Sequence, residues 1–183
     1  MILIAGLGNY GTEYEKTRHN YGFMVIDAFQ KENDFPDFKL DKNSNSLVSM
    51  EGNIILVKPQ TYMNSSGKAV KKIADYYKIK HEDIIVIHDD VDVNLGEIKL
   101  AEDRGSAGHN GVESVINELG TKKFIRLRMG INSENPSFSE PISRGEGLES
   151  IVLKNFSNDE QAIVEEMIRQ AIKKLKELIQ TKQ

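Results

Sequence analysis

Four runs of apolar residues divide the chain and predict the strands of a sheet. They cover residues 1–6, 54–57, 84–88 and 124–131, and a further segment at 46–50 is placed to pair with the second run as a hairpin. Mainly apolar runs of this length are typical of strands in a buried sheet. We therefore expect a central sheet that helices cover on both sides.

Helical periodicity separates these strands. Apolar residues spaced three and four positions apart predict helices over 20–30, 66–78, 110–119 and 159–180. The last helix has a long apolar stripe, including Ile163, Met167 and Ile179, so we expect it to pack along the body of the protein. Strands that alternate with helices predict an α/β fold, a three-layer α/β/α sandwich with a mixed, mainly parallel sheet.

The domain organisation follows from length and composition. At 183 residues the chain fits a single domain, 1–183, and no repeat or linker divides it. The segment 132–149 is rich in Ser, Pro, Glu and Gly, which predicts a mobile, lid-like loop.

Composition narrows the class of protein. The chain has no cysteine, which excludes thiol catalysis, disulfides and cysteine-based zinc sites. No apolar stretch is long enough to span a bilayer and no signal peptide is recognisable, so we expect a cytoplasmic protein. A net charge of −4 and a pI near 5.6 argue against nonspecific coating of nucleic acid, but they leave room for a local RNA site.

Two motifs are misleading. Residues 6–11 match the glycine pattern of dinucleotide-binding proteins, but the next apolar helix begins about ten residues late and the acidic residue of a second strand is missing. Residues 90–96 resemble a calcium loop, yet the glycine is one place late and Ala101 stands where a bidentate glutamate is needed. We expect neither a nicotinamide nor a calcium site.

The polar stretch 17–20 is the most informative part of the chain. It lies between the first strand and a helix, where open α/β sheets place their chemistry, and His19 is the only histidine that we expect at such a position. Asp89 directly follows a buried strand, where a carboxylate is costly unless it is solvated or acts on a partner; a solvated turn is the alternative reading. No Gly-x-Ser-x-Gly motif is present, so water is the expected nucleophile.

Asparagines in three other loops complete the candidate site. Asn9, Asn64 and Asn110 could meet His19 and Asp89 at one edge of the sheet, where their amides could hold a carbonyl, a ribose or a water. Helix capping is the simpler alternative for Asn110 and for either Asn64 or Ser65.

These residues carry a resemblance. The chain resembles bacterial peptidyl-tRNA hydrolases in five blocks that keep the order and spacing of that family, at 6–9, 14–22, 58–64, 88–92 and 108–111, with weaker support at 124–131 and 151–156. The resemblance implies hydrolysis of the ester that joins a peptide to the 3′-terminal ribose of tRNA, without metal or cofactor. Peptidyl-tRNA is the implied partner, with no DNA and no membrane, and we expect a monomer.

The resemblance also implies roles for individual residues. His19 would take a proton from the attacking water, and Asp89 would orient its imidazole, whose ordinary pKa suits a base at neutral pH. Asn9 would separate peptidyl from free aminoacyl substrates. The remaining expected contacts to the substrate or to its transition state are Tyr14, Tyr62, Met63, Asn64 and Asn110, and those to the tRNA backbone are Arg128 and Lys99.

Several positions depart from the family pattern. Tyr10 stands where the family usually has proline, so we expect the loop of Asn9 to be less rigid. Ala107 replaces a common glycine, and Glu113 replaces a basic residue. Ala101 stands where a second basic residue would join Arg128 in a clamp on the tRNA 5′-phosphate, which predicts weaker binding unless another cation compensates, the candidates being Lys99, Lys122, Lys123 and Arg126.

Two other functions remain as alternatives. A non-catalytic RNA-binding relative of the same fold is the main one, although such a protein would not need the whole set of His19, Asp89 and the three asparagines. A nicotinamide enzyme is a distant third.

Overall fold

A mixed sheet forms the centre of the molecule in the computed structural model, which describes residues 1–132 and 147–182. Within these residues seven strands follow the order β2-β3-β4-β1-β5-β7-β6. The four central strands are parallel and comprise β4 (Ile54–Pro59), β1 (Ile2–Gly6), β5 (Ile84–Asn94) and β7 (Ile125–Asn132). The antiparallel outer strands are β2 (Lys39–Asp41), β3 (Ser46–Glu51) and β6 (Ile98–Ala101).

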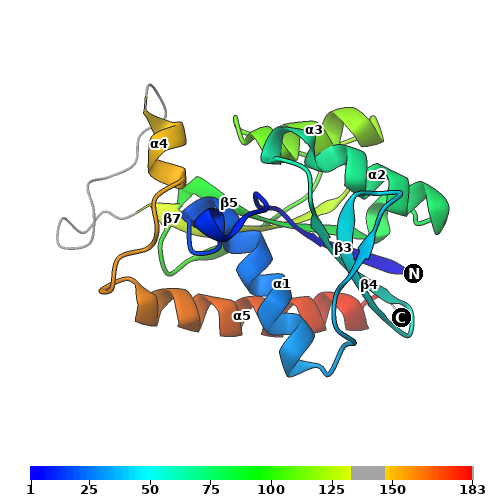
Figure 1. Ribbon diagram of the computed structural model, residues 1–183, viewed down its shortest axis with the longest axis horizontal. Helices are drawn as coiled ribbons and strands as arrows, with labels where there is room; N and C mark the ends of the chain where they lie inside the picture. Colours follow the sequence, from blue (N-terminus) through cyan, green and yellow to red (C-terminus); the bar gives the residue numbers. More distant parts are fainter. Residues whose placement is uncertain (133–146, 183) are drawn as a thin grey trace.

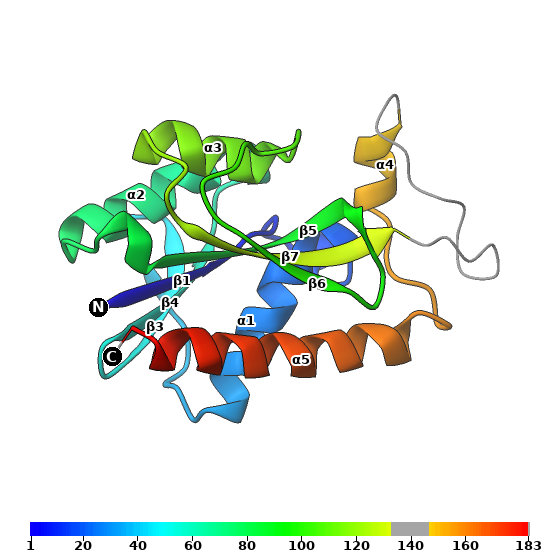
Figure 2. The same cartoon turned by 180° about the vertical axis from the view of Figure 1, so that it is seen from behind.

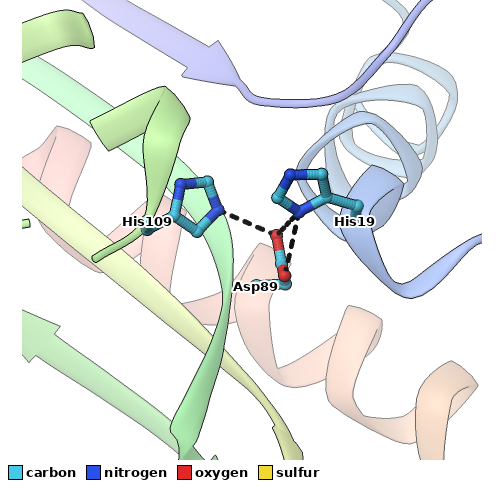
Figure 3. Close-up of side chains that lie close together, drawn as sticks. All are labelled: His19, Asp89 and His109. Atoms are coloured by element: carbon cyan, nitrogen blue, oxygen red, sulfur yellow. Dashed lines mark hydrogen bonds and ion pairs between the residues drawn. The ribbon is translucent and has the colours of Figure 1, made fainter. Parts of the chain in front are cut away.

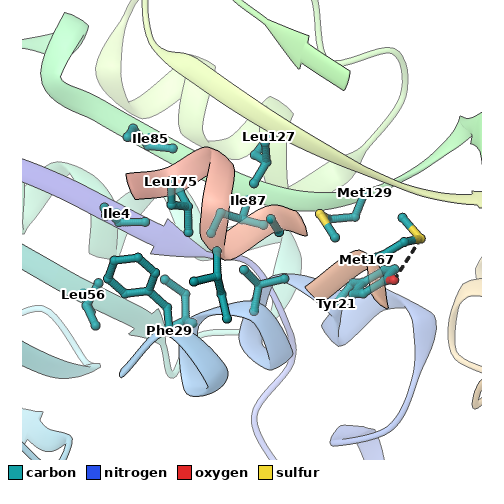
Figure 4. Close-up of a cluster of buried hydrophobic side chains, with 14 of the residues drawn as sticks. Ile4, Tyr21, Phe29, Leu56, Ile85, Ile87, Leu127, Met129, Met167 and Leu175 are labelled. Atoms are coloured by element: carbon teal, nitrogen blue, oxygen red, sulfur yellow. Dashed lines mark hydrogen bonds between the residues drawn. The ribbon is translucent and has the colours of Figure 1, made fainter. Parts of the chain in front are cut away.

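Helices cover both faces of this sheet (Figures 1 and 2). One face carries α1 (Tyr21–Glu32) and α5 (Gln161–Gln180), and the other carries α2 (Ser66–Tyr76) and α3 (Asn110–Leu119). Each face has its own apolar core, and Figure 4 shows the one beneath α1 and α5, where Phe29 and Leu175 meet side chains of the central strands. A short helix, α4 (Leu148–Val152), lies at the end of the sheet away from the two chain termini.

The expected α/β/α sandwich with its mainly parallel sheet is confirmed. The four apolar runs are β1, β4, β5 and β7, and the expected hairpin partner is β3. The expected helices correspond to α1, α2, α3 and α5, with shifts of a few residues at their ends. Strands β2 and β6 were not predicted, because both are short, half-exposed strands at the edges of the sheet and carry polar residues.

The expected loop at 132–149 lies mostly outside the described residues. At its two ends the prediction was wrong, because Asn132 belongs to β7 and both Leu148 and Glu149 belong to α4. None of the helices within residues 1–132 and 147–182 is long and apolar enough to cross a membrane.

Close packing at the start of α1 brings the polar stretch against the sheet. A Cβ atom on Gly22 would lie 2.4 Å from both the backbone nitrogen of Leu7 and the backbone oxygen of Ile87. Only glycine allows this approach, so α1 begins directly beside the carboxyl ends of β1 and β5. The preceding 3₁₀ turn, Arg18–Asn20, is thereby held at the same edge of the sheet.

Candidate active site

A cavity opens at the carboxyl ends of the central strands. It has a volume of about 480 Å³, and α4 forms one of its walls. Strand β1 pairs with β4 on one side and with β5 on the other, so the cavity lies where open α/β sheets bind their ligands. Its lining includes all but two of the expected site residues, namely Asn9, Tyr14, His19, Tyr62, Met63, Asn64, Asp89 and Asn110.

His19 and Asp89 are in direct contact. Nδ1 of His19 lies 2.9 and 3.1 Å from the two carboxylate oxygens of Asp89 (Figure 3). Asp89 is almost fully buried inside β5, so the alternative of a solvated turn is wrong. A carboxylate accepts hydrogen bonds, which places the imidazole proton on Nδ1. Nε2 of His19 points away from Asp89 and has no hydrogen-bond partner in the described part of the chain.

A second histidine, His109, contacts the same carboxylate. Its Nδ1 accepts hydrogen bonds from the backbone N–H groups of Gly111 and Val112 at 3.1 and 3.2 Å, which makes it the N-cap of α3. Its proton is therefore on Nε2, which donates to Oδ1 of Asp89 at 3.0 Å. The alternative that Asn110 caps this helix is therefore wrong. The expectation that His19 is the only histidine in a loop that enters a helix is also wrong.

Burial and neighbouring charges shift the pKa values of the titratable groups in and beside the cavity. Burial disfavours charged His19, but the negative charges of Asp89 and Glu149 and the hydrogen bond to Asp89 outweigh burial, so the pKa of His19 is raised. Burial alone would raise the pKa of Asp89, but the two histidines hold it well below its ordinary value. His88 is fully buried next to the His109 ring, and burial lowers the pKa of His88 to about 3.

Asn9 is held by two neighbouring segments. Its backbone nitrogen donates to Oδ1 of Asn20 at 2.8 Å, and its carbonyl accepts from Nδ2 of Asn20 at 2.9 Å. Its own Oδ1 accepts from the backbone nitrogen of Met63 at 2.9 Å. Because only oxygen can accept this bond, the orientation of the Asn9 amide is determined. Its Nδ2 has no partner among the described residues and remains available to the cavity.

The other two asparagines lie exposed on the cavity lining. Asn64 lies in the 3₁₀ turn Met63–Ser65 that precedes α2, and Asn110 is the first residue of α3. Ser65 occupies the N-cap position of α2, but its side chain makes no capping hydrogen bond. Capping therefore does not account for either asparagine.

The backbone before α3 is strained at one departure from the family pattern. Ala107 has a φ of 52°, a left-handed conformation that costs a residue with a Cβ about 1–2 kcal/mol. The glycine that is common at this position would adopt it without that cost.

The expected tRNA-backbone residues lie on the paired strands β6 and β7 at one edge of the sheet, outside the cavity lining. Lys99 of β6 pairs directly with Arg128 of β7, so the two side chains share a face. Nε of Arg128 donates to Oδ2 of Asp90 at 2.7 Å. Ala101 is buried and pairs with Arg126, whose guanidinium is also buried and donates to the carbonyls of the Arg104–Gly105 turn. Arg126 is therefore not free to compensate for Ala101.

One group of side chains could hold a metal ion. His19, Asp89 and His109 place two nitrogens and one oxygen within 4.8 Å of one another. The hydrogen bonds described above account for all three atoms, and Nδ1 of His109 is engaged by the backbone of α3. The expectation of a reaction without metal therefore stays a prediction.

Sequence reasoning missed three parts of this site. His109 directly precedes Asn110, in a loop that enters a helix at the same edge of the sheet as His19. This position could have indicated His109 as a site residue. Asn20 lies within the polar stretch, but its bond to Asn9 joins residues 11 apart and has no periodic signature. Glu149 of α4 was hidden in a segment that was read as a loop.

Comparison with known proteins places this site in a family. Residues 3–183 match the family model described as peptidyl-tRNA hydrolase. The chain belongs to the peptidyl-tRNA hydrolase family. It is 45% identical to the peptidyl-tRNA hydrolase of Mycoplasma capricolum, over 91% of this chain and 86% of that protein. It is 41% identical to that of Campylobacter jejuni, over 98% and 92% of the two chains.

A solved member of the peptidyl-tRNA hydrolase family has the same fold. The crystal structure of peptidyl-tRNA hydrolase from Acinetobacter baumannii superposes with a TM-score of 0.89 at 33% identity, covering 100% of this chain and 90% of that one.

Proposed function

We propose that this protein hydrolyses the ester bond between peptide and tRNA in peptidyl-tRNA, with His19 as the general base and Asp89 as the carboxylate that orients it. The observation that carries the mechanism is the contact of His19 Nδ1 with both oxygens of Asp89, which leaves Nε2 for a water molecule. The reaction releases free tRNA from prematurely terminated chains.

The proton transfer follows from this geometry. Nε2 takes a proton from water as the oxygen attacks the ester carbonyl, and the imidazole becomes positively charged. The tetrahedral intermediate then breaks the ester C–O bond, and the departing ribose oxygen of the tRNA takes the proton back from the imidazolium. Asp89 stabilises that charge, because its own low pKa keeps it ionised. The raised pKa of His19 makes it a stronger base, although a larger fraction is protonated at neutral pH. His109 donates to Oδ1 of Asp89, which His19 also contacts, and so helps to hold the carboxylate in place.

Asn9 separates peptidyl from free aminoacyl substrates in this proposal. Its oxygen is engaged by Met63, so it offers an N–H donor to the cavity. A donor pairs with the carbonyl oxygen of the first peptide bond, which a blocked or peptidyl substrate has. It pairs poorly with the α-ammonium group of a free aminoacyl-tRNA, which has no acceptor. Unpaired polar groups in a buried site discriminate strongly.

The other proposed contacts surround this centre. Asn64 and Asn110 hold the substrate and its transition state, and the side chains of Tyr14, Tyr62 and Met63 border the terminal nucleotide or peptide. Arg128 and Lys99 contact the tRNA backbone from the paired strands β7 and β6. We expect the protein to act in the cytoplasm as a monomer, with no cofactor or metal.

The test is release of free tRNA from N-acetyl-aminoacyl-tRNA in the presence of EDTA, beside unblocked aminoacyl-tRNA and a His19→Ala control. We expect cleavage of the blocked substrate alone, and a loss of about 10²–10⁴-fold in kcat for His19→Ala with tRNA binding retained. Binding without cleavage by the unaltered protein would instead indicate a non-catalytic RNA-binding relative. Equal loss of binding and turnover in His19→Ala would make His19 a structural residue.

A further inference from the structure

Two exposed tyrosines lie beside the hydrogen bond that orients Asn9. Tyr10 follows Asn9 in the chain, and Tyr62 precedes Met63. Their ring centroids are 4.7 Å apart at an interplanar angle of 38°, although the two residues keep 41% and 53% of their surface exposed. The two loops are therefore joined twice: by the hydrogen bond between Asn9 Oδ1 and Met63 N, and by the ring contact between the adjacent residues Tyr10 and Tyr62.

The backbone of the loop that carries Asn9 has few internal restraints. Gly8 and Gly11 flank Asn9 and Tyr10, and Gly11 has a φ of 116°, a conformation that residues with a Cβ rarely adopt. Two glycines around a dipeptide leave its backbone flexible unless side chains restrain it. Asn20 restrains the loop from the side of α1 through the backbone of Asn9. On the side of Met63, the restraints are the Asn9 side chain itself and the ring of Tyr10.

We infer that Tyr10, through its ring contact with Tyr62, is a positioning residue that holds the Asn9 amide in the orientation that discriminates peptidyl from aminoacyl substrates. The inference rests on the proposed role of Asn9. The contact joins the two loops whose separation would break the Asn9–Met63 bond. Without that bond the Asn9 amide can turn, and its oxygen can then accept a hydrogen bond from an α-ammonium group.

The expectation that Tyr10 leaves the loop less rigid than a proline would stays a prediction, but the two residues restrain the loop in different ways. Proline restricts the backbone of the loop from within by limiting φ. The Tyr10 side chain restrains the loop from outside, by packing on its neighbour.

The experiment measures a discrimination ratio, which is kcat/KM for N-acetyl-aminoacyl-tRNA divided by kcat/KM for the unblocked aminoacyl-tRNA. We expect Tyr10→Ala to lower this ratio about three- to tenfold, the range that an aromatic pair commonly contributes. Tyr10→Phe keeps the ring and should keep the ratio. Tyr76→Ala is the matched control, because Tyr76 is an exposed tyrosine that contacts Tyr77 on α2 and does not line the cavity.

A double-mutant cycle with Asn9→Ala separates positioning from direct contact with substrate. If Tyr10 acts through Asn9, Tyr10→Ala has no further effect on the ratio once Asn9 is alanine. An effect of the same size in both backgrounds overturns the inference, because the ring then contacts the substrate itself. An unchanged ratio in Tyr10→Ala alone also overturns it. An unchanged ratio in Asn9→Ala instead refutes the proposed role of Asn9.

Discussion

Arg18 and His19 are neighbours in the chain, and each forms a buried pair with an acidic residue. Arg18 donates through one terminal nitrogen to both oxygens of Glu160, at 3.0 and 2.7 Å, and through the other to the Asn155 carbonyl at 2.6 Å. Both of its terminal nitrogens are thus engaged by protein. His19 uses only Nδ1 for Asp89, and its other nitrogen is left for a ligand. The Nε of Arg18 also lacks a hydrogen-bond partner, but it is buried, whereas His19 lines the cavity. The two pairs therefore differ in whether the remaining nitrogen can reach a ligand.

The surroundings of the two pairs show the same difference. Glu160 also accepts the backbone N–H of Ser157 at 2.7 Å, and the Phe156 ring lies 5.1 Å from the Arg18 guanidinium carbon. These contacts fasten the segment after α4 to the turn that carries His19. Asp89 instead accepts hydrogen bonds from two histidines, both of which line the cavity. A paired buried charge thus stabilises the fold in one case and prepares a base in the other.

Among the variants that test this contrast, Asp89→Asn should produce the largest effect on turnover. An asparagine amide can donate to Nδ1 of His19, which would move the imidazole proton to Nε2, the position where the base needs a lone pair. We expect kcat to fall about 10²-fold. The pKa of His19 should also fall, because the negative charge that raises it is removed.

Since the neutral imidazole is the active form, activity rises with pH through the pKa of His19. The rising limb of the pH–rate profile should therefore move to lower pH in Asp89→Asn. Steady-state kinetics across the pH range would measure both effects, and an unshifted limb would contradict the pairing.

Glu160→Gln should act on stability instead. Arg18 would remain as a buried charge without a charged partner, which should lower the free energy of unfolding by about 3 kcal/mol. Urea unfolding would measure this loss. The control is Glu166→Gln, which breaks an exposed pair with Arg169 on α5 and should change stability little. A large fall in kcat of folded Glu160→Gln without loss of stability would contradict the contrast between the two pairs.

The predictable part of the fold was its centre. Strands β1, β4 and β5 contain unbroken apolar runs, and β7 is largely buried although Arg126 and Arg128 interrupt its apolar residues. In strand β6 the alternation of apolar and polar residues is too weak to predict a strand. Lys99 and Leu100 are both exposed, because β6 lies at the edge of the sheet. Local pattern therefore identifies buried strands better than edge strands.

The site residues that the sequence predicted lie where strands end and loops begin. Polar residues at the ends of apolar runs indicated His19, Asp89 and the asparagines, because parallel strands end at one edge. The Arg18–Glu160 pair joins residues 142 apart, and nothing local to either residue predicts the other. Which histidine contacts Asp89 through which nitrogen likewise depends on the folded geometry.

His109→Asn should have an intermediate effect and would sharpen the contrast between fold and chemistry. Asparagine can replace His109 as the N-cap of α3, so stability should change little. It removes the Nε2–H donor to Asp89, and a hydrogen bond to a charged group contributes about 1.5–3 kcal/mol. We expect kcat to fall about tenfold or somewhat more. Loss of stability with unchanged kcat would show that His109 serves only as a helix cap.

Ala101→Lys should have the smallest effect, and it tests the paired strands β6 and β7 rather than the cavity. Lysine at this buried position lies beside Arg126, whose pKa burial and Arg128 already lower. The new ammonium group must therefore reach solvent, on the face that Lys99 and Arg128 share. If it meets a tRNA phosphate, affinity for 5′-phosphorylated tRNA rises, and the slope of log K against log salt steepens by about 0.9. Titrations at several salt concentrations, with and without the 5′-phosphate, would measure this.

Lys99→Ala is the matched variant. A shallower slope in Lys99→Ala with no change in Ala101→Lys would show that Lys99 already occupies the place of the missing cation.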